Sequence, residues 1–299
     1  MSSVKIASGT KVLSLSDSKF KVVVSSEQPP APSSIPSGAA VAYSLRKLYN
    51  SYSGPAIRVK RSTDDLESDI GFTSGVLDTA ALTSFCGAGN GLIMTWYDQS
   101  GNANHATPSA WWSSPVIVKT GSVNTINSKP AIDFNTNLIE QQLGYLNINP
   151  FNVGGSFFHT FVGKPHTYGP SQFLSLTDAS FEAVFFGRDY DGHFYLQGKT
   201  TGHIKSNSSD SSTGPLLLTG IKNSSDQLSM YKNGSQIASS QITWNSPVPS
   251  AQISNIGGSL DGQILSNGLL QEIIFFNNLD QTTNRSTIES NINSFYGIY

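Results

Sequence analysis

Residues 227–238 read QLSMYKNGSQIA, in which two stretches of strand-forming residues flank the pair Asn233-Gly234. Asn-Gly is the strongest short signal for a β-hairpin, because both residues accept the positive φ angles of a type I′ turn. Further apolar or β-branched runs occur on both sides of this hairpin, separated by Gly, Asn, Asp and Pro. The clearest strand candidates are 93–97, 157–162, 181–186 and 271–276. The pattern predicts an all-β sandwich, with helices only near 40–50 and 281–294.

The first 38 residues differ from the rest of the chain. Apolar and β-branched runs at 12–15 and 20–24 predict short strands. A Pro/Ser-rich stretch at 26–38 predicts an extended, semi-rigid spacer. We therefore predict three parts: a β-rich attachment arm at 1–25, a linker at 26–38 and a sandwich at 39–299.

Composition excludes several classes of function. Charged residues make up 13% of the chain and the net charge is −2, so no cationic surface favours nucleic acid or an anionic membrane. No segment has the length of an apolar secretory signal at the start of the chain or of a membrane-spanning helix elsewhere. Cys86 is the only cysteine, which excludes an internal disulfide, and we expect it to be buried. The five histidines lack metal-ligand spacing, so we predict no metal and no cofactor.

Three segments between residues 42 and 105 occur together in one known family. AYSLRKLY at 42–49, GPAIRVKR at 54–61 and WYDQSGNANH at 96–105 resemble the opening of the catalytic domain of α-L-arabinofuranosidase B, in glycoside hydrolase family 54. The hairpin at 227–238 and the run LQEIIFF at 270–276 are similar to those of concanavalin A-like lectins and glucanases. The resemblance implies a concanavalin A-like jelly-roll sandwich over residues 39–299.

The resemblance also implies two catalytic positions. A retaining glycosidase needs two carboxyl groups about 5–5.5 Å apart, one as nucleophile and one as acid/base. FEAVFFG at 181–187 resembles the family's nucleophile strand, so Glu182 is the candidate nucleophile. Where the family has its acid/base Asp after a Gly-Gly pair, this chain has Ser259, which has no titratable proton in the required range. Asp261 could replace it only if a bulge or loop offsets a displacement of roughly 6.5–7 Å along a strand.

Four further residues are candidates for carbohydrate binding: Trp111, Trp112, Tyr190 and Asp98. Aromatic rings suit the C–H face of a sugar, and adjacent tryptophans on a strand would face opposite sides, leaving at least one near solvent. The structural alternatives are core packing for the rings, an Asx-type turn for Asp98 and a cross-strand or exposed acid for Glu182. For residues 189–192 we predict a turn rather than a calcium loop.

These observations lead to a non-enzymatic function as the main prediction. Because Ser259 occupies the acid/base position and no signal segment is present, we predict a virion surface protein of the capsid-decorating or tail-fibre type. It would display a lectin-like sandwich, bind host or environmental polysaccharide, and attach to other virion proteins through residues 1–38. The alternatives are an extracellular retaining α-L-arabinofuranosidase that uses Glu182 and Asp261, and a free lectin. Neither nucleic acid nor a membrane is a predicted partner.

Overall fold

The computed structural model divides into two compact units, Met1–Ala31 and Pro32–Tyr299. It describes residues 4–6, 11–16, 19–24, 35–135, 144–149, 151–166, 171–177, 183–198, 202–241, 253–258, 268–277 and 281–299. The first unit contains one antiparallel sheet of β1 (Val4–Ile6), β2 (Lys11–Ser16) and β3 (Lys19–Val24). The strands predicted at 12–15 and 20–24 are therefore confirmed. The boundaries of the three predicted parts stay a prediction.

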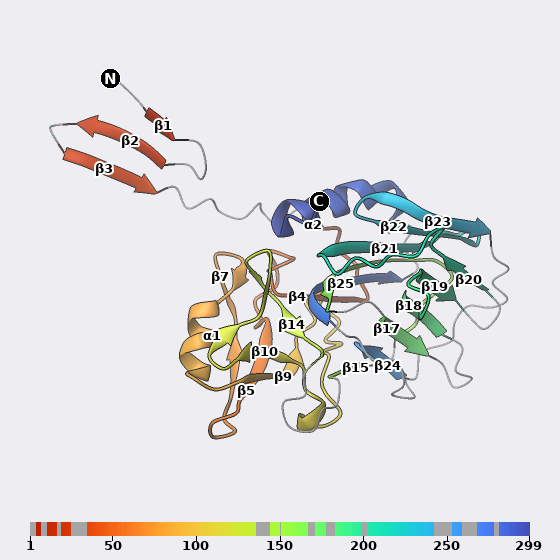
Figure 1. Ribbon diagram of the computed structural model, residues 1–299, viewed down its shortest axis with the longest axis horizontal. Coiled ribbons are helices and arrows are strands. Elements are labelled where there is room, and N and C mark those ends of the chain that lie inside the picture. Colours follow the sequence, from red (N-terminus) through yellow and green to blue (C-terminus); the bar gives the residue numbers. More distant parts are fainter. Residues whose placement is uncertain are drawn as a thin grey trace. The chain divides into compact units, whose positions relative to one another are not determined.

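The described residues of the second unit form two large antiparallel sheets, whose strands Figure 1 shows. The larger one has the order β23-β22-β21-β16-β25-β14-β10-β9-β5-β6, with β4 paired to β25 and β11 to β10. Its strands are β4 (Val41–Ser44), β5 (Ile57–Arg61), β6 (Glu67–Ile70), β9 (Gly91–Trp96), β10 (Val116–Lys119), β11 (Ser122–Val123), β14 (Ile132–Asp133), β16 (Phe157–Pro165), β21 (Leu216–Lys222), β22 (Gln227–Lys232), β23 (Ser235–Gln241) and β25 (Gly268–Asn277).

The smaller sheet has the order β15-β24-β17-β18-β19-β20. Its strands are β15 (Leu146–Ile148), β17 (Ser171–Thr177), β18 (Ala183–Arg188), β19 (Phe194–Gly198), β20 (Gly202–Lys205) and β24 (Ile253–Ile256). Among the described residues, the other elements are two short hairpins and four helices: β7 (Phe72–Thr73) with β8 (Val76–Leu77), β12 (Thr125–Ile126) with β13 (Lys129–Pro130), α1 (Thr79–Cys86), α2 (Arg285–Tyr296), and the 3₁₀ helices η1 (Trp111–Ser113) and η2 (Thr282–Asn284). The prediction of an all-β sandwich is confirmed.

The central strands of the larger sheet are buried on both faces. On β16, Phe157 and Phe161 belong to the core that also contains residues of the smaller sheet, and the Phe161 ring lies 4.2 Å from that of Phe173 on β17. Their neighbour Phe158 belongs to a second core, which includes Ile288 and Ile292 of α2. Because side chains alternate along a strand, β16 contributes to both cores at once.

Most predicted elements are present. The hairpin at Asn233-Gly234 is confirmed by β22 and β23, with φ values of 51° and 79° at the two turn residues. The strand predictions at 93–97, 157–162, 181–186 and 271–276 correspond to β9, β16, β18 and β25. The helix expected within 281–294 is α2.

Two helix predictions need correction. The helix expected near 40–50 is wrong, because Val41–Ser44 form β4 and pair with β25. Tyr43 then enters the core between the sheets while Ala42 enters the core under α2, an alternation that a strand provides. Conversely, α1 was not predicted, although Asp78 caps it by accepting a hydrogen bond from the Ala81 N–H at 2.9 Å.

A buried ion pair joins β4, β25 and α2. Arg46 donates from Nε to Glu272 Oε2 at 2.8 Å and from Nη2 to Oε1 at 3.0 Å, and the two side chains are 3% and 0% exposed. Glu272 also accepts hydrogen bonds from Ser44 Oγ at 2.7 Å and from the Tyr296 hydroxyl at 3.1 Å. The third guanidinium nitrogen of Arg46 donates to Asn291 on α2 at 2.8 Å. Every oxygen of this buried carboxylate is therefore occupied.

We predict that Glu272→Gln destabilises the fold strongly. The substitution leaves the Arg46 charge buried without its counter-ion, a change that typically costs about 3–5 kcal/mol. Equilibrium unfolding in urea measures it. Glu67→Gln is the matched control, because Glu67 pairs with Arg58 at 2.7 Å on the exposed surface and should change the midpoint little. Equal effects of both substitutions would contradict a dominant role for the buried pair.

A buried histidine lies between the two sheets. His159 on β16 is 1% exposed, and its ring lies 4.3 Å from that of Phe186 on β18. Its Nε2 has no hydrogen-bond partner among the described residues. Burial lowers the pKa of His159 to about 3. Gly220 pairs with His159 across the sheet, and a Cβ at position 220 would lie 2.2 Å from Nε2, so only glycine fits opposite this ring.

We predict that His159 makes the fold acid-sensitive. An unfolded histidine titrates near pH 6.5, whereas the folded one resists protonation down to about pH 3. Between these values the unfolded state binds the extra proton, so stability falls as the pH falls, by up to about 1.4 kcal/mol per pH unit from this group. Urea unfolding of wild type and His159→Leu from pH 7 to pH 4 measures the difference. Parallel pH profiles for the two proteins would contradict the prediction.

Candidate functional site

The predicted catalytic residues lie outside the described residues. Glu182, Ser259 and Asp261 fall in the intervals 178–182 and 259–267, so their assignment stays a prediction. The described strands nevertheless give the positions of the residues that come directly after Glu182 and directly before Ser259. β18 begins at Ala183, directly after Glu182, and β24 leads to Gly258, directly before Ser259.

These flanking residues lie toward opposite ends of β17. Ala183 pairs with Thr177 at the last position of β17, whereas the Gly257 N–H donates to the Phe173 carbonyl at 3.2 Å. Ala183 and Gly257 are therefore four residues apart along the strand direction and two strand spacings apart across the sheet, a separation of about 16 Å. Because a retaining pair needs about 5–5.5 Å, Glu182 can meet Asp261 only if the chain after Gly258 returns toward the Thr177 end.

The buried carboxylates of the described residues are all engaged. Asp98 accepts backbone N–H groups, Asp133 bonds to His166 Nε2 at 2.9 Å, and Glu272 pairs with Arg46. Glu289 pairs with Arg285, although burial raises its pKa. Within the described part of the chain, none of these four resembles a nucleophile that faces an open cleft.

Asp98 and its neighbours hold the strand β4 in place. Asp98 is 1% exposed, and its Oδ1 accepts the Ala42 N–H at 2.8 Å and the Ser100 N–H at 2.9 Å. Gln99 donates to the carbonyls of Ser44 and Arg46 at 3.0 and 2.9 Å. The Asx-type turn expected for Asp98 is confirmed. Its assignment to carbohydrate binding stays a prediction that its burial does not favour.

The adjacent tryptophans form an exposed aromatic pair. Trp111 and Trp112 are 41% and 44% exposed, and their rings meet edge to face with centroids 5.8 Å apart. The expectation that they lie on a strand is wrong, because they form η1, where the Ser113 Oγ donates to the Ala110 carbonyl at 2.9 Å. Both rings, rather than one, are therefore accessible. The Lys60 ammonium lies 5.0 Å from the centroid of the Trp111 ring.

Tyr190 projects from the turn between β18 and β19. It is 71% exposed, the largest exposed fraction among the exposed large hydrophobic side chains of the described residues. Asp189 Oδ1 accepts the N–H groups of Asp191 and His193 at 3.0 and 2.8 Å, so the turn predicted at 189–192 is confirmed. Asp189 also pairs with Lys205 at 2.7 Å. Like Trp111 and Trp112, Tyr190 has the accessibility that stacking on a sugar requires.

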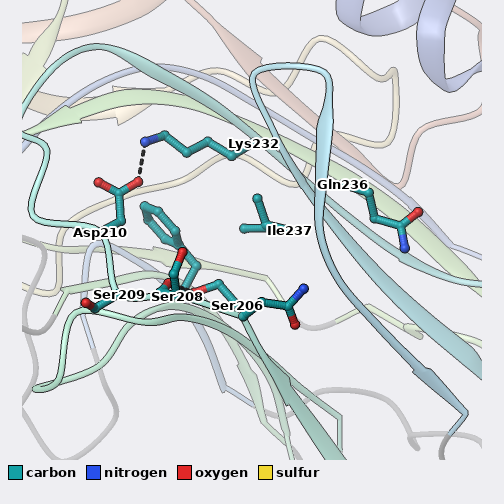
Figure 2. Close-up of a pocket in the computed structure, with 9 residues that line it drawn as sticks. Ser206, Ser208, Ser209, Asp210, Lys232, Gln236 and Ile237 are labelled. Atoms are coloured by element: carbon teal, nitrogen blue, oxygen red, sulfur yellow. Dashed lines mark hydrogen bonds and ion pairs between the residues drawn. The ribbon is translucent and has the colours of Figure 1, made fainter.

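A pocket that the sequence did not predict lies between the two sheets. It has a volume of about 270 Å³, and Figure 2 shows its lining side chains. They come from β19 (Phe194), from the loop 206–210 after β20, and from the hairpin β22–β23 (Lys232, Gln236 and Ile237). The run SNSSDSS at 206–212 indicates a loop, but no sequence signal connects that loop to Lys232.

Three other expectations concern the described residues. Cys86 is 1% exposed, which confirms its expected burial. In the described part of the chain, no group of three or more His, Cys, Asp or Glu side chains could hold a metal ion. No helix among the same residues is long and apolar enough to cross a membrane.

The fold and part of the sequence are similar to those of α-L-arabinofuranosidases. The chain is a concanavalin A-like sandwich, and residues 31–135 match the family described as α-L-arabinofuranosidase B, catalytic. Over 87% of its length it superposes on an arabinofuranosidase complexed with arabinofuranosyl-α-1,2-xylobiose, with a TM-score of 0.65, 17% identity and 63% of that chain covered. An α-L-arabinofuranosidase of glycoside hydrolase family 54 soaked with a cyclic sulfate inhibitor gives a TM-score of 0.64 at 16% identity, with the same coverage.

The particular resemblance is to α-L-arabinofuranosidases of fungi. A probable α-L-arabinofuranosidase B of Aspergillus fumigatus is 47% identical over 74 residues, which is 23% of this chain and 15% of the relative. The α-L-arabinofuranosidase of Hypocrea jecorina is 41% identical over 73 residues, again 23% and 15%. The chain thus spans less than a fifth of the length of these curated relatives. The resemblance predicted from residues 42–105 is confirmed.

The main functional prediction, a non-enzymatic virion surface protein, is wrong. The relatives and the solved structures reported above are α-L-arabinofuranosidases, and none of them is a virion component. That prediction depended in part on Ser259 at a single family position. A serine there shows that this position cannot supply the acid, but another carboxyl group can do so from a different part of the chain.

Proposed function

We propose that this chain is a retaining glycoside hydrolase of the α-L-arabinofuranosidase type. The observation that carries the proposal is the match of residues 31–135 to the catalytic domain of that family, together with its fold over most of the chain. The matched residues include β4, the residues Asp98 and Gln99 that bond to it, and the tryptophan pair. They precede Glu182 and Asp261. The family match therefore supports the class of substrate, and the catalytic pair has to be tested directly.

The proposed chemistry is a double displacement. The Glu182 carboxylate attacks the anomeric carbon of an arabinofuranosyl unit, while the Asp261 carboxyl group protonates the departing glycosidic oxygen. The C–O bond to the leaving group breaks as the bond to Glu182 forms. In the second step Asp261, now a carboxylate, takes a proton from a water molecule, and the water oxygen attacks the anomeric carbon. The bond between that carbon and Glu182 breaks, which releases arabinose and restores the Glu182 carboxylate.

We predict hydrolysis of 4-nitrophenyl α-L-arabinofuranoside by the wild-type chain and its loss in Glu182→Gln, because the amide cannot act as the nucleophile. Asp261→Asn should lower kcat/KM about 10²–10⁴-fold on arabinofuranosyl-xylobiose. Its effect on the nitrophenyl substrate should be smaller, because nitrophenolate leaves without protonation. Release of nitrophenolate and of arabinose measures the two reactions.

Asp65→Asn is the control for these carboxylate substitutions, since the Asp65 side chain is 77% exposed and its ion pair among the described residues is with Lys60. Absence of hydrolysis by the wild-type chain would contradict the proposed function. Full activity of Asp261→Asn on both substrates would contradict its role as acid/base and leave Glu182 in need of another partner.

Binding of the surrounding polysaccharide is proposed for the exposed rings Trp111, Trp112 and Tyr190. Each presents an accessible aromatic face, and the neighbouring Lys60 amine can donate hydrogen bonds to sugar hydroxyls. An extracellular location accords with a polysaccharide substrate. The proposed virion location depended on the non-enzymatic interpretation and is not retained, and attachment of residues 1–38 to another protein stays a prediction.

We predict that Trp111→Ala and Trp112→Ala each weaken binding to arabinoxylan by about 2- to 12-fold, the range expected for one aromatic contact of 0.5–1.5 kcal/mol. Affinity electrophoresis in gels containing the polysaccharide measures the retardation. Leu66→Ala is the matched control, because Leu66 is 54% exposed and offers no ring. Unchanged retardation in both tryptophan variants would contradict the proposed stacking.

A further inference from the structure

The pocket between the loop 206–210 and the hairpin β22–β23 has rigid walls. The Ser206 N–H donates to the Phe194 carbonyl at 2.8 Å, and the Asn207 N–H donates to the Ile237 carbonyl at 3.0 Å. The loop is therefore bonded to β19 on one side and to β23 on the other. Because both bonds use backbone groups, the loop has a fixed shape before any ligand arrives.

Two cations hold the far end of the loop. Arg188 on β18 is fully buried and donates to the carbonyls of Asp210 and Ser212 at 3.3 and 3.2 Å. Lys232 on β22 pairs with the Asp210 carboxylate and donates to Ser212 Oγ at 3.1 Å. Figure 2 shows the Lys232 and Asp210 side chains converging above the loop. The pair is about one-fifth exposed, so its remaining donor and acceptor positions can reach a ligand.

The charges around the pocket balance. Two charged side chains line it, Lys232 and Asp210, and they pair with each other. A balanced site gives no net attraction to an anion or a cation, because the fields of the paired charges largely cancel. A neutral ligand with several hydroxyl groups suits it better, since hydroxyls both donate to Asp210 and accept from Lys232.

Unused polar groups complete the lining. Within the described residues, the Ser208 and Ser209 hydroxyls have no hydrogen bond to the rest of the chain, and both residues are exposed at the pocket. Ile237 adds an apolar contact. The volume of about 270 Å³ is enough for one sugar ring.

The pocket loop is bonded to the turn between β18 and β19. The Asp210 N–H donates to the Gly192 carbonyl at 2.9 Å, which joins the pocket loop to the turn that carries Tyr190. The pocket itself combines polar groups with the apolar side chains of Phe194 and Ile237. This combination suits a sugar, whose hydroxyls bond to the polar groups and whose C–H bonds contact the apolar ones.

We propose that this pocket binds one neutral sugar unit, at the Arg188 end of β18 rather than at the Ala183 end. The choice of a pentose, and of an α-L-arabinofuranosyl unit in particular, rests on the proposed function. The site would hold a side branch of the polysaccharide while another branch is processed. This binding requires no bond to be made or broken, so it is independent of hydrolysis.

The test is a titration of the full chain with methyl α-L-arabinofuranoside, followed by amide NMR signals. We expect saturable shifts at residues 207–210, 232 and 237 in the millimolar range. Ser208→Ala/Ser209→Ala should weaken this binding at least fivefold. Ser224→Ala/Ser225→Ala is the matched control, because these adjacent serines are exposed on the turn between β21 and β22. No shifts at the pocket, or equal binding by both double variants, would overturn the proposal.

Two further measurements separate this proposal from other possibilities. Inorganic phosphate and glucuronate should not shift the same signals, and stronger binding of either would overturn the inference of a neutral ligand. Pocket binding by a chain that hydrolyses no arabinofuranoside would contradict the proposed function alone. Hydrolysis without pocket binding would overturn only the present inference.

Discussion

The buried Arg46–Glu272 pair is the constraint on which the sandwich depends. It connects β4, the central strand β25 and the helix α2 at a place from which water is excluded. Removing two charges from water is costly, and here the cost is offset because Ser44, Asn291 and Tyr296 also bond to the pair. A hydrophobic contact at the same place would be less specific about register. The ion pair accepts only one alignment of β4 against β25.

A second set of contacts fixes the same strand from the opposite side. Asp98 and Gln99 bond to the backbone of residues 42–48, and Asn102 donates to the carbonyls of Ala39 and Ala40 at 3.0 and 3.1 Å. This segment, 96–105, carries the most recognisable part of the family resemblance. Its polar residues are thus devoted largely to holding the backbone of residues 39–48. A strong sequence match in this region is therefore better evidence for a shared fold than for a shared reaction.

The sequence predicted the repetitive parts of the structure well. Asn233-Gly234 specified a hairpin because turn geometry is local, and the apolar runs at 157–162 and 271–276 specified strands buried on both faces. The local pattern near 40–50 favours a helix, whereas residues 41–44 form a strand because they pair with β25, more than 220 residues away in the sequence. The pocket was missed for the same reason. Lys232 and Asp210 meet only after the two sheets pack, and neither residue signals this contact locally.

The contact between His159 and Gly220 also limits how this fold can change during evolution. The two positions face each other on adjacent strands, and the imidazole occupies the space that any β-carbon at 220 would need. A side chain can therefore appear at position 220 only after the ring at 159 has been replaced by something smaller, and the order of the two changes is fixed. Sequences descended from this one should carry either the ring or the β-carbon, and an intermediate with both would be excluded by its packing.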